Sequence, residues 1–390
     1  MDTELQGTYL ILENLNQKTI MQNTIKYKAL ILLTAVIAFS GCRKIFNLPE
    51  ERDYLSTRAD FTQKVFDPRL GRTTISTNIF NADNSSFPMK FEIVNPRFGD
   101  GRDASDMLAV KPTLVWTSEY TGKETSLAEI EAKRKLEPHP MVELRSSGDF
   151  ILWNTATRDI LKPQDSVVYP QDVRYFDVKI SNSGGTRVIK NLQFSPKIEV
   201  PYEPSADYNL ITGQPNTTTP GGKARVFNYP SITGIVRGEL TNTPFEGANN
   251  ANTGIVYMYI RKYTGDGANG SSLRFKFLNK DSVAIDPNRF GDTKWDRLVH
   301  GFNMVKTSTY VKYDVAYPIP LARVPTAYTA GGINDLNGGN DAYVEFSYSR
   351  IGFGNVRETG RISTNFKIFE KGDWEIVFHF KTVNPKFAND

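Results

Sequence analysis

The stretch DWEIVFHFKTV, residues 373–383, decides the fold class of this chain. Every second residue from Trp374 to Phe380 is large and apolar, whereas Glu375 and His379 fall on the other side of the alternation. Successive side chains of a β-strand point to opposite faces, so a period of two predicts a strand with one core face. We therefore expect His379 at a solvent-facing or edge position.

The same alternation recurs along most of the chain, with Gly, Pro, Asn, Asp and Ser between the runs. Short strands separated by turn residues are typical of an all-β protein. We predict two β-sandwich or jelly-roll-like domains. The sequence has no fixed-period repeat, which disfavours a propeller or a solenoid. The alternating runs are 73–80, 88–94, 113–120, 150–155, 173–185 and 187–200, then 253–263, 271–285, 308–319, 341–353 and 360–370.

One segment, SLAEIEAKRKLEP at residues 126–138, departs from this pattern. Ser126 with Glu129 three residues later is a capping box, which can satisfy two free amide groups at a helix start. Pro138 should end the helix because proline cannot continue it. The segment predicts one short helix at 126–136 in the first domain.

Domain boundaries are predicted from length and composition. Roughly 350 residues follow the N-terminal signal described below, and a guide of about 150 residues per domain favours two domains. Residues 201–228 are rich in proline and polar turn residues, and we predict a linker there, between a domain at 61–200 and one at 229–390. The alternative is a long loop within one large sandwich.

The N-terminal segment is typical of a secretory signal. Residues 29–39 are uncharged and too short for a permanent span, which needs about 18–20 residues. Lysines precede them and small residues follow, before Cys42, the single cysteine of the chain. We expect a signal at 1–41, a true start at Met21 and a tether at 42–60. The Ser-Gly-Cys exit resembles the lipobox of bacterial lipoproteins, which implies cleavage before Cys42 and acylation of its sulfur. The alternative for Cys42 is a small residue in an uncleaved anchor.

Charge and motifs exclude several functions. The net charge is +4 with both signs interspersed, so no basic stripe favours nucleic acid. Metalloprotease, nucleophile-elbow, phosphate-loop and paired-cysteine motifs do not occur, and no catalytic residue is predicted. A glycosidase needs only two carboxylates, and four in or beside strands are candidates, although charged residues on a wet strand face look the same. The four are Glu119, Glu345, Asp373 and Glu375.

Three loops rich in Asp, Asn and Gly could offer oxygen ligands to calcium, namely 99–106, 265–270 and 334–341. None has the spacing of a helix-loop-helix calcium site, and the same residues are favoured in turns for conformational reasons. We interpret them as turns. No metal or other cofactor is predicted, with calcium as the weaker alternative.

Aromatic residues, at 12% of the chain, are the best functional lead. Exposed rings can stack on sugar faces while neighbouring polar groups bind the hydroxyls. Trp116, Trp153 and Trp374 lie inside alternating runs and are expected in the core. Trp295 stands between predicted strands in GDTKWDRL and is the single candidate ligand contact, with Tyr310, Tyr313, Tyr317 and Tyr328 in similar loop-rich stretches. Packing in the interior is the alternative for all five, because aromatic residues are the main filling of β-sandwiches.

The mature chain resembles the two-domain, β-rich lipoproteins of unknown function found in Bacteroidota. The resemblance is carried by LGRTTISTNIFNADNSSFPMKFEIVNPRFGDG (70–101) and YTGKETSLAEIEAKRK (120–135). It implies a non-enzymatic accessory protein, lipid-anchored at the outer membrane, that binds glycan or another extracellular polymer beside an outer-membrane transport complex. The periplasmic or surface orientation stays open. The alternatives are a structural or adhesion protein without a small ligand and, third, a glycoside hydrolase.

Lipid anchoring can be tested at Cys42. Replacing Cys42 by Ala removes the sulfur that would carry the acyl chains, so the variant should leave the membrane fraction and accumulate in a soluble or unprocessed form. Cell fractionation with immunoblotting measures this. A variant that stays with membranes as the parent protein does would contradict anchoring through this residue.

Overall fold

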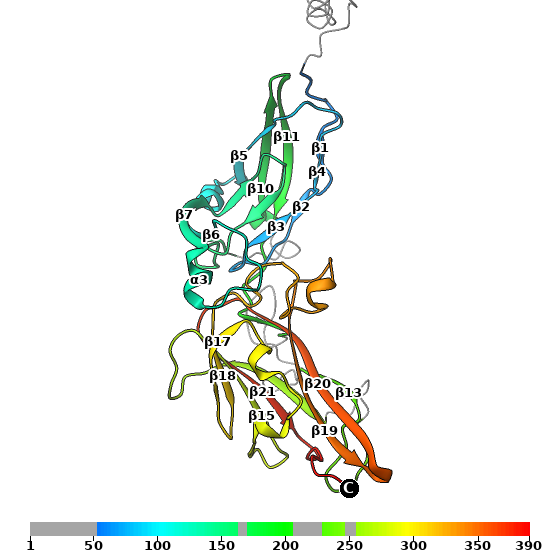
Figure 1. Ribbon diagram of the computed structural model, residues 1–390. Helices are drawn as coiled ribbons and strands as arrows, with labels where there is room; N and C mark the ends of the chain where they lie inside the picture. Colours follow the sequence, from blue (N-terminus) through cyan, green and yellow to red (C-terminus); the bar gives the residue numbers. More distant parts are fainter. Residues whose placement is uncertain (1–52, 163–169, 206–227, 246–254) are drawn as a thin grey trace, which may run out of the picture. The chain divides into compact units, whose positions relative to one another are not determined.

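The computed structural model describes residues 53–162, 170–205, 228–245 and 255–390 (Figure 1), and Tyr54–Asp390 belong to one unit. The predicted signal, Cys42 and most of the tether and linker lie outside the described residues. Below, the N-terminal lobe denotes the described residues of 54–200, and the C-terminal lobe those of 201–390.

Short strands make up most of both lobes. In the N-terminal lobe they are β1 (Asp60–Phe61), β2 (Val65–Phe66), β3 (Thr74–Ser76), β4 (Phe80–Asn81), β5 (Lys90–Phe98), β6 (Val110–Trp116), β7 (Arg134–Pro140), β8 (Val142–Leu144), β9 (Phe150–Leu152), β10 (Arg174–Asn182) and β11 (Gly185–Phe194). In the C-terminal lobe they are β12 (Tyr202–Glu203), β13 (Ser231–Gly234), β14 (Val256–Lys262), β15 (Ser272–Leu278), β16 (Ala284–Ile285), β17 (Gly301–Lys306), β18 (Val311–Val315), β19 (Ala342–Gly352), β20 (Val356–Ile368) and β21 (Asp373–Phe380).

The N-terminal lobe is built from two main sheets that share one hydrophobic core. One sheet has the order β2-β11-β10-β5, and the other has the order β3-β9-β8. Phe66 of the first stacks on Phe150 of the second with ring centroids 4.2 Å apart, and Phe150 also contacts Phe176 and Phe194. These four side chains are fully buried. The alternation in the sequence therefore directs phenylalanines from both sheets into a common interior.

The C-terminal lobe is a second sandwich. Its larger sheet runs β14-β21-β15-β18-β17 with β16 beside β15, and its smaller sheet contains β12, β13, β19 and β20. Phe346 of β19 crosses between them, with its ring 5.5, 4.9 and 5.1 Å from Phe275, Phe277 and Phe378. The all-β prediction is thus confirmed.

The two lobes have separate hydrophobic cores, and a third, smaller cluster draws on both. Tyr120 and Ile130 of the N-terminal lobe and Ala316 and Leu321 of the C-terminal lobe are its buried members. The division into two domains joined at 201–228 stays a prediction, because residues 206–227 lie outside the described part.

The described residues contain one α-helix, α3 (Leu127–Ala132), which begins where the sequence predicts. The Ser126 hydroxyl accepts a hydrogen bond from the Glu129 amide, and the Glu129 carboxylate accepts one from the Thr125 amide. The predicted end at residue 136 is wrong, because Arg134–Pro140 forms β7 and pairs with β6. Pairing with a partner strand outweighs the local helical pattern here.

The expectation that His379 faces solvent or a sheet edge is corrected by the structure. β21 lies between β14 and β15, and all eight of its residues are buried, His379 included. Burial lowers the pKa of His379, and the nearby Lys381 adds to this effect. The alternation correctly indicates two faces, but the second face is covered as well.

The role of Phe346 as the bridge between sheets predicts a large stability loss on truncation. Phe346→Ala should lower the free energy of unfolding by about 3–5 kcal/mol, because a fully buried ring leaves a cavity between the two sheets. Phe353→Ala, at a 90% exposed position just beyond the same strand, should change it by less than about 0.5 kcal/mol. Urea unfolding of both variants measures the difference, and equal losses would contradict this packing.

Candidate functional site

A cleft of about 1170 Å³ is lined by residues from both lobes. Small-molecule sites commonly measure about 300–1,000 Å³, so this cleft could take an extended ligand. Its lining comes from segments far apart in sequence: Gly71, Leu114, Leu127, Glu131, Arg134, Asn154, Thr157, Arg158 and residues 199–202, together with residues 260–262, Ser271, residues 315–318, residues 369–371 and Trp374.

The cleft has buried aromatic side chains in its wall. Trp374 and Tyr202 meet edge to face with ring centroids 5.6 Å apart, and the Trp374 indole N–H donates to the Glu370 carbonyl at 2.9 Å. The Tyr317 hydroxyl donates to the Ser272 carbonyl at 3.1 Å, and burial raises its pKa. These rings are held by the surrounding strands, so they form a rigid apolar base for the cleft.

Charged side chains line the same cleft in ion pairs. Arg158 pairs with Glu199 at 3.1 Å, and Lys262 of β14 pairs with Glu370. The three side chains Arg158, Lys262 and Glu370 are about half exposed, which keeps them accessible to a ligand. A cleft with an apolar base and charged groups at the surface can bind polar groups and exclude water from apolar ones.

Arg134 lines the cleft from the N-terminal lobe and also contacts the C-terminal lobe. Its Nη1 donates to the Tyr317 carbonyl at 2.8 Å, its Nη2 pairs with Glu131 of α3, and its guanidinium lies 5.3 Å from the Trp116 ring. The side chain is 5% exposed. Because a buried guanidinium needs partners for its donors, these contacts fix how α3 borders the cleft.

A second polar contact between the lobes lies beside the cleft. The Tyr120 hydroxyl is 2.6 Å from Nδ1 of His300, whose Nε2 is 2.8 Å from the Glu124 carbonyl. The His300 ring also stacks on Tyr328 at 4.9 Å. Lys133 and Thr121 donate to the buried Glu124 carboxylate, which ties the Tyr120 loop to the end of α3. This cluster holds the loop that carries Tyr120 against the C-terminal lobe.

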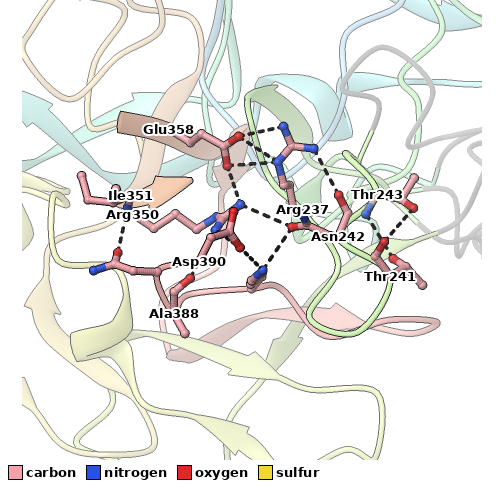
Figure 2. Close-up of polar contacts among 11 residues, drawn as sticks. Arg237, Thr241, Asn242, Thr243, Arg350, Ile351, Glu358, Ala388 and Asp390 are labelled. Atoms are coloured by element: carbon pink, nitrogen blue, oxygen red, sulfur yellow. Dashed lines mark hydrogen bonds and ion pairs between the residues drawn. The ribbon is translucent and has the colours of Figure 1, made fainter. Parts of the chain in front are cut away.

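Another dense polar cluster lies at the end of the β19–β20 hairpin (Figure 2). Arg350, 1% exposed, contacts Glu358 at 2.6 Å and Asp390 at 3.2 Å, and Arg237 donates to both oxygens of Glu358. Lys386 pairs with Asp390. Every charged side chain of this cluster has an oppositely charged partner within it, so we interpret it as the fastening of the C-terminal segment to the hairpin.

Trp295, the candidate ligand contact, is buried and does not face solvent. It begins the 3₁₀ turn Trp295–Arg297, is 7% exposed, and packs with Phe277 and Phe346 at 6.3 and 5.5 Å. Its carbonyl accepts a hydrogen bond from the Tyr313 hydroxyl at 2.5 Å. The reason is that the turn folds back over the end of the sandwich core, so the ring fills the interior.

The other aromatic candidates are also engaged in packing. Tyr313 and Tyr317 are buried, Tyr328 stacks on His300, and Tyr310 lies 4.7 Å from the Arg274 guanidinium. The predicted core positions Trp153 and Trp374 are buried and Trp116 is half-buried. The rings singled out from the sequence therefore do not gather into one exposed binding surface.

The candidate carboxylates separate into different environments. Asp373 accepts bonds from the Asn269 and Gly270 amides, and Glu375 pairs with Arg261. Glu345 belongs to the other sheet and accepts from the Tyr343 hydroxyl. Glu119 is exposed on a loop. Three of the four thus have structural partners.

The acidic loops make contacts within their own turns. Asp100 accepts from Arg102, and Asp335 accepts from the Asn337 amide. Within the described residues, no group of three or more His, Cys, Asp and Glu side chains could hold a metal ion. The absence of a cofactor stays a prediction, as does lipidation of Cys42, which lies outside the described residues.

Comparisons with known proteins identify a family but no characterised relative. A family model described as "Domain of unknown function (DUF5007)" matches residues 80–389, more than half of the chain. No curated protein and no solved structure matches the chain.

The Tyr120 loop generates a prediction about acid stability. Burial raises the pKa of Glu124, but hydrogen bonds from Lys133 and Thr121 outweigh it and lower this pKa from 4.5 to about 2. The unfolded chain therefore takes up a proton first as the pH falls, and the stabilisation present above pH 4.5 is lost between about 4.5 and 2.

Urea unfolding at pH 6 and pH 3 measures this loss. The free energy of unfolding should fall less between the two values in Glu124→Gln than in the parent protein. Glu119→Gln, an exposed neighbour, should retain the parental pH dependence. The same pH dependence in all three proteins would contradict the role of Glu124.

Proposed function

We propose that this chain, which belongs to the DUF5007 family, a domain of unknown function, is a non-catalytic binding protein for glycan or another extracellular polymer. The cleft lined by both lobes is the proposed ligand site. One observation carries the proposal: a cavity of about 1170 Å³ combines a rigid apolar base with accessible charged side chains.

The chemistry of a saccharide fits such a cleft. Sugar hydroxyls need hydrogen-bond donors and acceptors, which Arg158, Lys262, Glu370 and the exposed Asn154 can supply. The apolar C–H faces of a sugar can lie against the side chains of Leu114 and Leu127. The volume of about 1170 Å³ favours several consecutive units of a polymer over a single small molecule.

The proposed location is the outer membrane of a bacterium of the Bacteroidota, with acyl chains on Cys42 as the anchor. The signal-like run before Cys42 and the small residues at its exit support this proposal. No helix among the described residues is long and apolar enough to cross a membrane. An outer-membrane transport complex is the proposed protein partner, and the orientation at the membrane is left open.

A glycoside hydrolase is the less favoured alternative. Such an enzyme needs one carboxyl that donates a proton and another that acts as base or nucleophile. The carboxylates lining the cleft are Glu131, Glu199 and Glu370, and each pairs with a basic side chain. A carboxylate held in an ion pair is not free to reach a glycosidic bond. A structural or adhesion role without a small ligand is the other alternative.

Filling the cleft tests the proposal. Asn154 lines the cleft and is exposed, so Asn154→Trp should occupy ligand space without disturbing the core. We expect its affinity for a polysaccharide that the parent protein retains in a pull-down to drop about tenfold or more, equal to at least about 1.4 kcal/mol of binding free energy.

Thr186→Trp, at an exposed position on β11 away from the cleft lining, is the matched control. It should bind as the parent protein does, and thermal unfolding should verify that both variants are folded. Equal affinities for all three proteins would remove the cleft as the ligand site. Release of sugar products from any polysaccharide would favour the hydrolase instead.

A further inference from the structure

We propose that the ligand of the cleft is anionic, a saccharide chain bearing carboxylate or sulfate groups. This inference rests on the proposed function and adds the chemical class of the ligand. The balance of charge in and beside the cleft supports it.

Basic side chains outnumber acidic ones along the cleft. Among the described residues, its lining includes five basic residues and three carboxylates. Glu375, which pairs with Arg261 from outside the lining, brings the ratio only to five against four. The uncompensated charge is therefore positive, and its field is strengthened by the low-dielectric walls of the cleft. The basic residues are Arg134, Arg158, Arg261, Lys262 and Lys371.

Lys371 accounts for the excess positive charge of the cleft lining. It lies in the turn between β20 and β21, is exposed, and lines the cleft beside Glu370. Among the described residues no carboxylate forms an ion pair with it, whereas its neighbour Lys262 is paired with Glu370. An ammonium group in a cleft without a protein partner is available to a ligand anion.

A second group of basic side chains adjoins the cleft at Phe369. The Arg72 guanidinium lies 3.6 Å above the Phe369 ring, which belongs to the lining. Arg72 and Arg69 both approach Glu203, at 3.0 and 3.9 Å, and Lys367 approaches it at 3.6 Å. Asp341 pairs with Lys367 at 3.2 Å, so three basic groups here share two carboxylates.

Several donor atoms of this group are not bonded to protein. Within the described residues, Nε and Nη2 of Arg72 and Nη1 of Arg69 are buried without a hydrogen-bond partner. An unpaired buried donor costs free energy, and the cost rises when the donor is charged. These buried atoms are out of reach of a ligand, and the excess of three basic groups over two carboxylates is what places positive charge beside the cleft.

An anionic sugar fits this arrangement better than a neutral one. Carboxylate and sulfate oxygens accept charge-assisted hydrogen bonds, which are about twice as strong as neutral ones. A neutral hydroxyl would leave the excess charge uncompensated after water is displaced. Lys371 is expected to contact the anionic group directly, and Lys262 can exchange its bond with Glu370 for one with the ligand.

Matched polymer pairs test the charge preference. Binding of the detergent-solubilised full chain is measured by calorimetry to dextran sulfate against dextran, and to polygalacturonate against its methyl ester. At least one charged polymer should bind about tenfold more tightly than its neutral counterpart, a difference of about 1.4 kcal/mol. A preference within the first pair alone identifies sulfate, and within the second pair alone carboxylate.

Two variants of equal charge separate the cleft from general electrostatic attraction. Lys262→Gln with Lys371→Gln should weaken binding of the charged polymer roughly fivefold, as expected for two partly exposed contacts. Lys280→Gln with Lys381→Gln removes the same charge from exposed positions outside the lining and should leave the affinity unchanged.

Equal losses in both double variants would overturn the inference, because binding would then follow net charge and not the cleft. Equal affinity for the charged and neutral members of both pairs would also overturn it, while leaving the proposed polymer-binding function intact. A third outcome would also overturn the inference and leave the proposed function intact. In that outcome none of the four probes binds, another neutral polysaccharide is retained, and Asn154→Trp abolishes its binding. Absence of binding to every polymer would overturn the proposed function as well.

Discussion

Burial of β21 on both faces is the constraint on which the C-terminal lobe depends. One face meets the smaller sheet through Phe378 and Phe346, and the other must bury Glu375 and His379. A buried charge is tolerated only with a partner, and Arg261 stands directly opposite Glu375 on β14 and pairs with it. The register of β14 against β21 thus satisfies packing and charge together. Trp374 is the second residue of the same strand, so the base of the cleft is set by the same register.

The lobes contact each other through a mixture of apolar and polar groups. The small cluster that includes Ile130 and Ala316 buries apolar surface from both sides. Arg134 to Tyr317 and Tyr120 to His300 add directed hydrogen bonds next to it. Apolar contact is not directional, whereas hydrogen bonds lose strength quickly as their geometry departs from the optimum. The polar contacts therefore orient the walls of the cleft, while the apolar cluster supplies much of the attraction.

Two groups of charged side chains in this protein differ in how fully they are paired and buried. Around Glu358, guanidinium groups and carboxylates pair with each other at the end of the hairpin, where Arg350 is almost fully buried (Figure 2). Around the cleft, each ion pair has at least one member that is about half exposed, and Lys371 belongs to no ion pair among the described residues. A network in which each charged side chain has an opposite partner and the central guanidinium is buried holds the chain in place. An open group with excess positive charge can exchange its partners for those of a ligand.

Local sequence signals were sufficient to predict the all-β class and the start of α3. These signals are alternation every two residues for the strands, and the pairing of Ser126 with Glu129 for the helix start. Local sequence could not predict the end of α3, because residues from Arg134 onward pair with β6. It also could not predict the burial of His379 and Trp295, since a residue's exposure depends on which distant segment covers it. Only the tertiary structure brought Arg134, Arg158, Lys262 and Lys371 to one cleft. These residues come from four separate segments, and sequence spacing carries no information about which strand ends and loops will meet once the sheets have packed.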